Sequence, residues 1–193
     1  MTIKTIFLDR DGVINKEKNY LYKIKEFEFI DGVFRACKFF KELDYKIIVI
    51  TNQSGISRNY YTENDFKSLN SWMITQFKKN DIDILDVFHC PHGPKSNCTC
   101  RKPKPGMLLK AQIKYNIDMK NSWMIGDHEI DIIAANNAGI SNTVLVRSGH
   151  LIDESTSNAR YILDSIDQSR HCLLYTSDAA DDLLCVDLGG RRI

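Results

Sequence analysis

Residues 5–15 read TIFLDRDGVIN, and the interpretation of the whole chain starts from this stretch. The apolar run at residues 5–8 predicts a short buried strand that ends in two carboxylates, Asp9 and Asp11. Gly12 lets the backbone turn sharply, so both carboxylates can face one pocket at the carboxyl end of the strand. Two acids whose one basic neighbour is Arg10 repel each other unless a cation lies between them, and Mg²⁺ prefers oxygen ligands. An ordinary Asp-Gly turn after a strand is the alternative.

Short apolar runs alternate with amphipathic segments along the chain. Strands are expected at residues 5–8, 46–50, 84–89, 122–125 and 143–146, with a sixth at 161–163. Helices are expected at residues 31–43 with Asp31 as N-cap, from Thr62 with Asp65 in its first turn, and at 107–115 and 130–138. The alternation predicts an α/β fold, a Rossmann-like three-layer sandwich with a mainly parallel sheet and helices on both faces.

The composition is that of an ordinary globular protein. The chain has 193 residues, of which 43% are hydrophobic and 26% charged, and its formal net charge is +1. The length favours one domain, and the balanced charge argues against a nucleic-acid partner. Because the sequence has neither a signal peptide nor an apolar run of about 18 residues, we expect a cytoplasmic protein without membrane association. Cysteines in that compartment rarely form disulfides.

The last stretch, residues 172–193, has neither strand alternation nor a clean helical stripe, so no stripe of its side chains is expected to need burial and a cut after Arg170 is expected to cost little stability. From Cys172 onward it can be encoded by DNA that resembles the transposase adapter used to prepare sequencing libraries. We therefore predict one domain over residues 1–171 and a non-native read-through tail over residues 172–193. A genuine amphipathic tail is the alternative.

Polar residues follow several of the expected strands at their carboxyl ends, where open parallel sheets bind ligands. Asp9 and Asp11 follow the first strand, Thr51 and Asn52 the second, and Asp127 the fourth. Three residues from the neighbouring loop and helix complete the set: Arg101, Lys102 and Asp131. Carboxylates, a hydroxyl and a basic pair around a metal are what phosphoryl transfer to an aspartate requires.

A second cluster lies in residues 90–106, the loop that holds all four prolines of the chain. Its three thiolates and one imidazole come from Cys90, His92, Cys98 and Cys100. This soft and closed set suits tetrahedral Zn²⁺ in a structural role, so we expect a zinc-stabilised loop insertion that aims the basic pair at residues 101–102. His89 is expected to be a strand-end side chain rather than a ligand. Chance clustering of cysteines is the alternative.

In order and spacing, these motifs resemble the four motifs of the haloacid dehalogenase-like phosphatases over residues 3–147. The stretches that match are DRDGV at residues 9–13, Thr51, KP at residues 102–103 and GDHEID at residues 126–131. The resemblance implies a Mg²⁺-dependent phosphoric monoester hydrolase. It implies that Asp9 is the nucleophile and a metal ligand, and that Asp11 is the general acid/base whose carbonyl also binds the metal.

The resemblance also implies roles for the other motif residues. Thr51 and Lys102 hold the transferring phosphoryl group, Asp127 completes the Mg²⁺ site, and Asp131 supports that site without binding the metal. Substrate contacts are expected from four residues: Tyr20, Asn52, Arg101 and His128. In the family, the last of these positions usually carries Lys or Arg. A histidine with an ordinary pKa of about 6.5 is only partly charged at neutral pH.

The zinc loop resembles two groups within the family, the heptose bisphosphate phosphatases and the histidinol-phosphate phosphatases. The stretches TNQSGI at 51–56, FEFIDGV at 27–33 and RKPKPGM at 101–107 favour the first group. We therefore expect a monomer that hydrolyses the 7-phosphate of D-glycero-D-manno-heptose 1,7-bisphosphate, a precursor of lipopolysaccharide. Histidinol phosphate is the alternative substrate.

A different class of function is a catalytically inactive binding module built around the zinc loop. Four intact motif residues argue against it: Asp9, Asp11, Lys102 and Asp127. No large cap domain fits between Asp9 and Thr51. We therefore expect the loop of residues 16–29 and the zinc loop to close the pocket.

Overall fold

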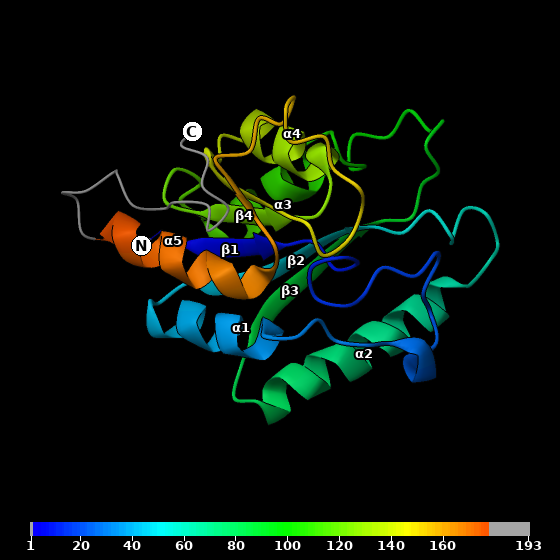
Figure 1. Cartoon of the computed structure of the whole chain (residues 1–193). Helices are drawn as coiled ribbons and strands as arrows, with labels where there is room; N and C mark the ends of the chain where they lie inside the picture. Colours follow the sequence, from blue (N-terminus) through cyan, green and yellow to red (C-terminus); the bar gives the residue numbers. More distant parts are fainter. Residues whose placement is uncertain (1, 178–193) are drawn as a thin grey trace.

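A parallel sheet between two layers of helices organises residues 2–177, the part of the chain that the computed structural model describes (Figure 1). Its strands are β1 (Thr5–Leu8), β2 (Lys46–Asn52), β3 (Ile84–Cys90), β4 (Trp123–Gly126), β5 (Asn142–Val146) and β6 (Tyr161–Leu163). They lie in the order β3-β2-β1-β4-β5-β6, and each neighbouring pair is parallel. The predicted α/β sandwich is confirmed, and β2 and β3 run slightly further than expected.

The helices divide between the two faces of the sheet (Figure 1). One face carries α1 (Val33–Glu42), α2 (Glu63–Lys79) and α5 (Ser169–Ser177), and the other carries α3 (Gly106–Tyr115) and α4 (Glu129–Asn137). Single 3₁₀ turns lie at Ile24–Glu26 and Ile166–Gln168. Successive strand side chains point to opposite faces, so Ile6 and Leu8 pack into one core cluster and Phe7 into the other.

Two helix starts test the sequence predictions. At α2, the Thr62 hydroxyl accepts from Asp65 N at 3.2 Å and the Asp65 carboxylate accepts from Thr62 N at 2.8 Å, so the predicted capping box is confirmed. At α1, the predicted N-cap Asp31 is wrong, because Gly32 occupies that position with φ of 81° and without a capping side-chain bond. A Cβ on Gly32 would collide with Asp167, so this left-handed turn needs glycine.

The chain crosses the sheet in two directions from its centre. From β1 the chain runs through α1 to β2 and through α2 to β3. It then returns through α3 to β4, on the other side of β1. The strand order therefore reverses beside β1, and open α/β sheets bind ligands at the carboxyl ends of the strands next to such a reversal. Between β1 and β2 the structure has a loop, one 3₁₀ turn and α1, so no large cap domain is inserted there.

The C-terminal helix α5 changes one expectation. Cys172 and Leu173 are buried in the core cluster that also contains residues of α1, so the expectation that no stripe of tail side chains needs burial is wrong for these two. Residues 178–193 of the predicted tail lie outside the described part of the chain. The domain boundary and the read-through origin therefore stay predictions. Within residues 2–177, no helix has the length and apolar character needed to cross a membrane.

Candidate active site

Three carboxylates gather at the carboxyl edge of the sheet. Asp9 follows β1, Asp127 follows β4 and Asp131 lies in the first turn of α4, and each offers an oxygen within 4.8 Å of the others. Burial raises the pKa of Asp9 to about 6, opposed by Lys102 and reinforced by Asp131. Burial and the charge of Asp9 also raise the pKa of Asp127. Acidic oxygens that repel each other in this way fit a hard divalent cation.

Glycines give the carboxylates room to approach. Gly12 has φ of 83°, and a Cβ there would collide with the Asp127 carboxylate. Gly149 packs against the same carboxylate from the segment after β5, and a Cβ there would also collide with it. Gly12, in the turn after Asp11, therefore also packs against Asp127 at the end of β4.

Lys102 reaches this cluster from the cysteine-containing loop. Its Nζ lies 2.8 Å from Asp9 Oδ1 and 2.6 Å from Asp131 Oδ1, and it donates to the Ile50 carbonyl at 2.9 Å. Burial lowers the pKa of Lys102, but the two acids outweigh burial and hold the pKa above its ordinary value. The side chain is therefore a fixed cation beside Asp9. Asp131 holds it there, which gives Asp131 a direct task that the sequence motif does not reveal.

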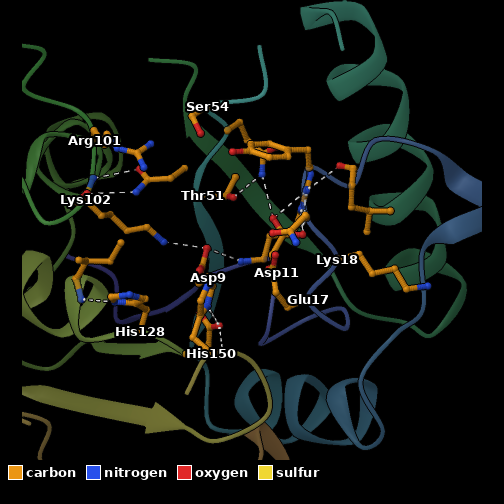
Figure 2. A pocket seen from close by; sticks show the side chains of 18 of the residues that line it. Asp9, Asp11, Glu17, Lys18, Thr51, Ser54, Arg101, Lys102, His128 and His150 are labelled. Carbon is orange, nitrogen blue, oxygen red and sulfur yellow. Dashed lines mark hydrogen bonds and ion pairs between the residues drawn. The ribbon is translucent and has the colours of Figure 1, made fainter. Parts of the chain in front are cut away.

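Asp11 faces the same space and is held by several donors. The Arg10 guanidinium donates to both Asp11 oxygens, with its Nη2 at 3.0 and 2.9 Å. Asn15 Nδ2 donates to Oδ1 at 3.0 Å and Gln53 Nε2 donates to Oδ2 at 3.1 Å. Figure 2 shows Asp9 and Asp11 close together below Thr51. Asp11 therefore has a fixed orientation next to Asp9.

The end of β2 contributes two side chains with different tasks. Thr51 is buried and lines the cavity. Asn52 also lines it, but its side-chain oxygen accepts from Lys102 N at 3.1 Å and its nitrogen donates to Lys102 O at 3.2 Å. This paired contact fastens the cysteine-containing loop to the sheet. Asn52, which the sequence predicts as a substrate contact, is thus already engaged in positioning Lys102.

These side chains line a cavity of about 290 Å³ (Figure 2). The loop of residues 16–29 supplies part of its wall, including Glu17, Lys18 and Tyr20, and Arg101 reaches it from the other loop. Both loops expected to close the pocket therefore line it. Tyr20 has φ of 59° and packs edge-on against Tyr60 at 4.7 Å. Arg101 donates to the His92 carbonyl at 3.2 Å.

Two histidines line the cavity, and sequence reasoning selected only one of them. His150 Nδ1 lies 2.6 Å from Asp127 Oδ2, and this contact holds the His150 pKa above its ordinary value although burial lowers it. His128 is the N-cap of α4 and accepts from Ile130 N at 3.2 Å, and burial lowers its pKa. His150 lies in the segment after β5 but four residues beyond its end, so the strand-end rule that selects Asp127 does not single it out.

Glu17 is another residue of the cavity lining that the sequence analysis did not select. Burial raises its pKa to about 7, and the charge of Asp11 adds to that rise. Its position in an irregular loop gives no periodic signal, which explains why the sequence does not single it out.

The second cluster brings its four predicted ligand atoms together. Cys90 Sγ lies 3.2 Å from Cys100 Sγ and 3.8 Å from Cys98 Sγ, and His92 Nδ1 lies 3.3 Å from Cys100 Sγ. A tetrahedral ion with bonds of about 2.3 Å separates its ligands by about 3.8 Å, so these atoms fit around one metal ion. His89 lies outside the cluster and instead contacts Glu63 of α2 at 3.0 Å.

Comparisons with known proteins identify the family. A family model described as HAD-hydrolase-like matches residues 99–169. The D-glycero-alpha-D-manno-heptose-1,7-bisphosphate 7-phosphatase of Photorhabdus laumondii is 48% identical over 164 residues, which cover 81% of this chain and 90% of that protein. The chain belongs to this family of HAD-like phosphatases. The predicted resemblance is therefore confirmed.

Other relatives agree with that membership. The D-glycero-alpha-D-manno-heptose-1,7-bisphosphate 7-phosphatase of Campylobacter jejuni is 51% identical over 146 residues, which cover 76% of this chain and 84% of that protein. The beta-anomer 7-phosphatase of Escherichia coli K12 is 42% identical over 173 residues, which cover 86% and 91%. The solved D,D-heptose 1,7-bisphosphate phosphatase of B. bronchiseptica, complexed with magnesium and phosphate, is 28% identical, covers 90% of this chain and 99% of that one, and has a TM-score of 0.79.

Proposed function

We propose that this chain hydrolyses the 7-phosphate of D-glycero-D-manno-heptose 1,7-bisphosphate, with Asp9 as the nucleophile. The observation that carries the proposal is the Asp9 carboxylate in the lining of the cavity, held 2.8 Å from the buried Lys102 ammonium. A carboxylate beside a fixed cation can attack phosphorus while the cation stabilises charge on the phosphoryl oxygens. The similarity to heptose-1,7-bisphosphate 7-phosphatases supports this choice of substrate.

The reaction proceeds in two steps. An Asp9 oxygen attacks phosphorus, the bond from phosphorus to the sugar oxygen breaks, and the leaving oxygen takes a proton from Asp11. Water then attacks the aspartyl-phosphate and gives a proton back to Asp11, which releases inorganic phosphate and restores Asp9. Lys102 and Thr51 hold the phosphoryl oxygens throughout.

The residues around Asp9 fit a Mg²⁺ ion. Asp9, Asp127 and the backbone carbonyl of Asp11 would hold it, and when bound it neutralises charge on the phosphoryl oxygens. The fit rests on the grouped carboxylate oxygens of Asp9 and Asp127, whose burial and mutual repulsion raise their pKa values. Asp131 already pairs with Lys102 at 2.6 Å, which supports a positioning role for it rather than metal binding.

The four ligands of the second cluster would hold a structural Zn²⁺ ion. Three thiolates and an imidazole satisfy a tetrahedral ion completely and leave no position open for substrate. Such an ion would fix the loop that ends at Lys102, which Asn52 fastens to β2. The effect of zinc on the reaction would therefore be indirect, through the position of Lys102.

Arg101 would bind the second phosphate of the substrate. It lines the cavity, and a planar guanidinium can clasp a phosphate with two parallel hydrogen bonds. Tyr20 and His128 line the same cavity and would contact the sugar. The positive charge of Arg101 would disfavour binding of histidinol phosphate, which carries cationic groups.

The deciding measurement is kcat/KM on the heptose bisphosphate, in both anomers, beside histidinol phosphate and a simple monophosphate. We expect Arg101→Ala to raise KM at least about tenfold for the bisphosphate and far less for the monophosphate. Lys95→Ala, an exposed lysine of the same loop outside the cavity lining, is the matched control. A preference for histidinol phosphate, or an equal loss on both substrates, would contradict the assignment and favour the alternative.

We also propose that the enzyme is a cytoplasmic monomer without a nucleic-acid partner. Light scattering during gel filtration tests the oligomeric state, and a dimer mass at micromolar concentration would contradict it.

A further inference from the structure

Gln53 lies at the centre of a buried hydrogen-bond network that joins two parts of the proposed site. Gln53 directly follows β2 and is 3% exposed. Its Nε2 donates to Thr51 Oγ1 at 2.8 Å and to Asp11 Oδ2 at 3.1 Å. Its Oε1 accepts from the Tyr61 hydroxyl at 2.5 Å. Thr51 and Asp11, both labelled in Figure 2, are thus connected through one amide.

The chemistry of its partners fixes the direction of this amide. A carboxylate only accepts hydrogen bonds, so the nitrogen of Gln53 must face Asp11 and its oxygen must face away. The Tyr61 hydroxyl donates a hydrogen bond to that oxygen. Burial raises the pKa of Tyr61 to about 12, so the hydroxyl keeps its proton. A flipped amide would set its oxygen against the Asp11 carboxylate and lose both donated bonds.

The direction of the amide decides what Thr51 and Asp11 can do. Because the Thr51 oxygen accepts from Gln53, its own proton must point elsewhere, and Thr51 lines the cavity where the phosphoryl group would lie. Asp11 Oδ2 accepts from both Gln53 Nε2 and Arg10 Nη2, and Gln53 adds to the limit that Arg10 sets on the rotation of this carboxylate toward or away from the leaving oxygen. One amide thus orients a donor to the phosphoryl group and the acid that protonates the leaving group.

Packing places Tyr61 for this task. A Cβ on Gly55 would collide with the Tyr61 ring, so the turn after β2 leaves room for the ring only because residue 55 is glycine. Tyr22 from the loop of residues 16–29 stacks on the same ring at 5.4 Å with an interplanar angle of 16°. Tyr61 is 5% exposed and lines the cavity.

We propose that Gln53 and Tyr61 are positioning residues for phosphate-ester hydrolysis. Tyr61 fixes the orientation of the Gln53 amide, and Gln53 in turn orients Asp11 for proton transfer and Thr51 for phosphoryl binding. The inference rests on the proposed function, because it requires Asp11 as the proton donor. It adds two residues that touch neither the reacting phosphorus nor the metal in the proposed mechanism.

Two variants and their combination test the proposal. Tyr61→Phe removes only the hydroxyl, and Gln53→Met keeps the side-chain volume but removes both polar ends. For the sugar phosphate we expect kcat to fall about tenfold in Tyr61→Phe and about 100-fold in Gln53→Met, with KM within about twofold, because part of the contribution of a positioned general acid is lost. Since Tyr61 acts through Gln53, the double variant should be no slower than Gln53→Met.

A second substrate separates positioning from general damage. p-Nitrophenyl phosphate releases a phenolate that leaves without needing a proton, so a misplaced Asp11 matters less for it. We expect the loss in Tyr61→Phe to be at least about fivefold smaller on this substrate than on the sugar phosphate. Tyr60→Phe, at a neighbouring tyrosine that is 53% exposed and does not line the cavity, should leave both substrates unaffected.

The outcomes distinguish this inference from the proposed function. Full activity in Tyr61→Phe, equal losses on both substrates, or additive losses in the double variant would overturn the positioning roles while the wild type stays active. A wild-type protein inactive on every phosphate ester would overturn the proposed function, and this inference with it. Melting temperatures near that of the wild type show that the variants are folded.

Discussion

The acidic site and the cysteine-containing loop meet at one edge of the sheet but are assembled in opposite ways. The acidic site joins Thr51, near the end of β2, to Asp9 and Asp127, which follow β1 and β4, so it exists only when the sheet is paired. The four cluster ligands all come from residues 90–100 and need only a local turn around a metal. Lys102 belongs to both regions. A substitution or metal loss in one region should therefore leave the other region intact, unless it acts through Lys102.

The largest effect on activity is expected at Asp9. Asp9→Asn keeps the shape of the side chain but cannot attack phosphorus, so kcat should fall at least about 1,000-fold. The loop should be untouched, because its ligands do not contact Asp9. Phosphate release and zinc content measured on the same sample check this. Residual activity above a few per cent, with the product identified, would remove Asp9 as the nucleophile.

Asp131→Asn should lower both activity and stability, because Asp131 holds Lys102 at 2.6 Å inside the protein. We expect kcat to fall about 100-fold and the free energy of unfolding to fall by about 3 kcal/mol, the cost of breaking a buried ion pair. The amide can still accept from His128 N, so the start of α4 is retained.

A surface ion pair provides the matched control for Asp131. Asp86 pairs with Lys114 at 2.8 Å, and their side chains are 25% and 54% exposed. Asp86→Asn should therefore cost less than about 1 kcal/mol and leave activity unchanged. Equal unfolding free energies in urea for the two variants would show that the burial of Lys102 adds nothing to its pairing.

The same contrast explains which features the sequence reveals. Strand ends and a local cysteine cluster are visible, because periodicity locates the strands and the ligands are close in the chain. The pairing of Lys102 with Asp131 and the contact of its backbone with Asn52 depend on side-chain positions that exist only after the loop docks. Gln53 belongs to the TNQSGI stretch, yet its bridging contacts have no sequence signal. His150 lies four residues beyond the end of β5, and only the fold brings it to Asp127.

Removing the proposed zinc ion from the loop should have an intermediate effect. A strong chelator followed by addition of Mg²⁺ should loosen the loop and lower kcat about tenfold, because Lys102 loses its support from one side while Asp9, Asp131 and Ile50 O still hold it. The melting temperature should fall by several degrees without unfolding the sheet. Zinc content near one ion per chain is expected. A metal-free protein with unchanged activity and melting temperature would contradict the proposed structural role of zinc.

The smallest effect on activity is expected at α5, which contributes to neither region. Leu173 is 2% exposed in the core cluster with α1, so Leu173→Ala should lower the free energy of unfolding by about 2–4 kcal/mol while kcat is unchanged. Leu174→Ala, at a neighbour that is 46% exposed, is the control and should cost less than about 1 kcal/mol.

Two truncations then separate the helix from the rest of the tail. A chain cut after Arg170 loses the buried Cys172 and Leu173 and should be at least as destabilised as Leu173→Ala, which replaces the expectation that this cut costs little. A chain cut after Ser177 keeps both residues, and under the read-through hypothesis its unfolding in urea and its kcat should match those of the full chain. A clear loss of stability in the second truncation would mean that residues 178–193 contribute to the fold, and the adapter interpretation would then be wrong.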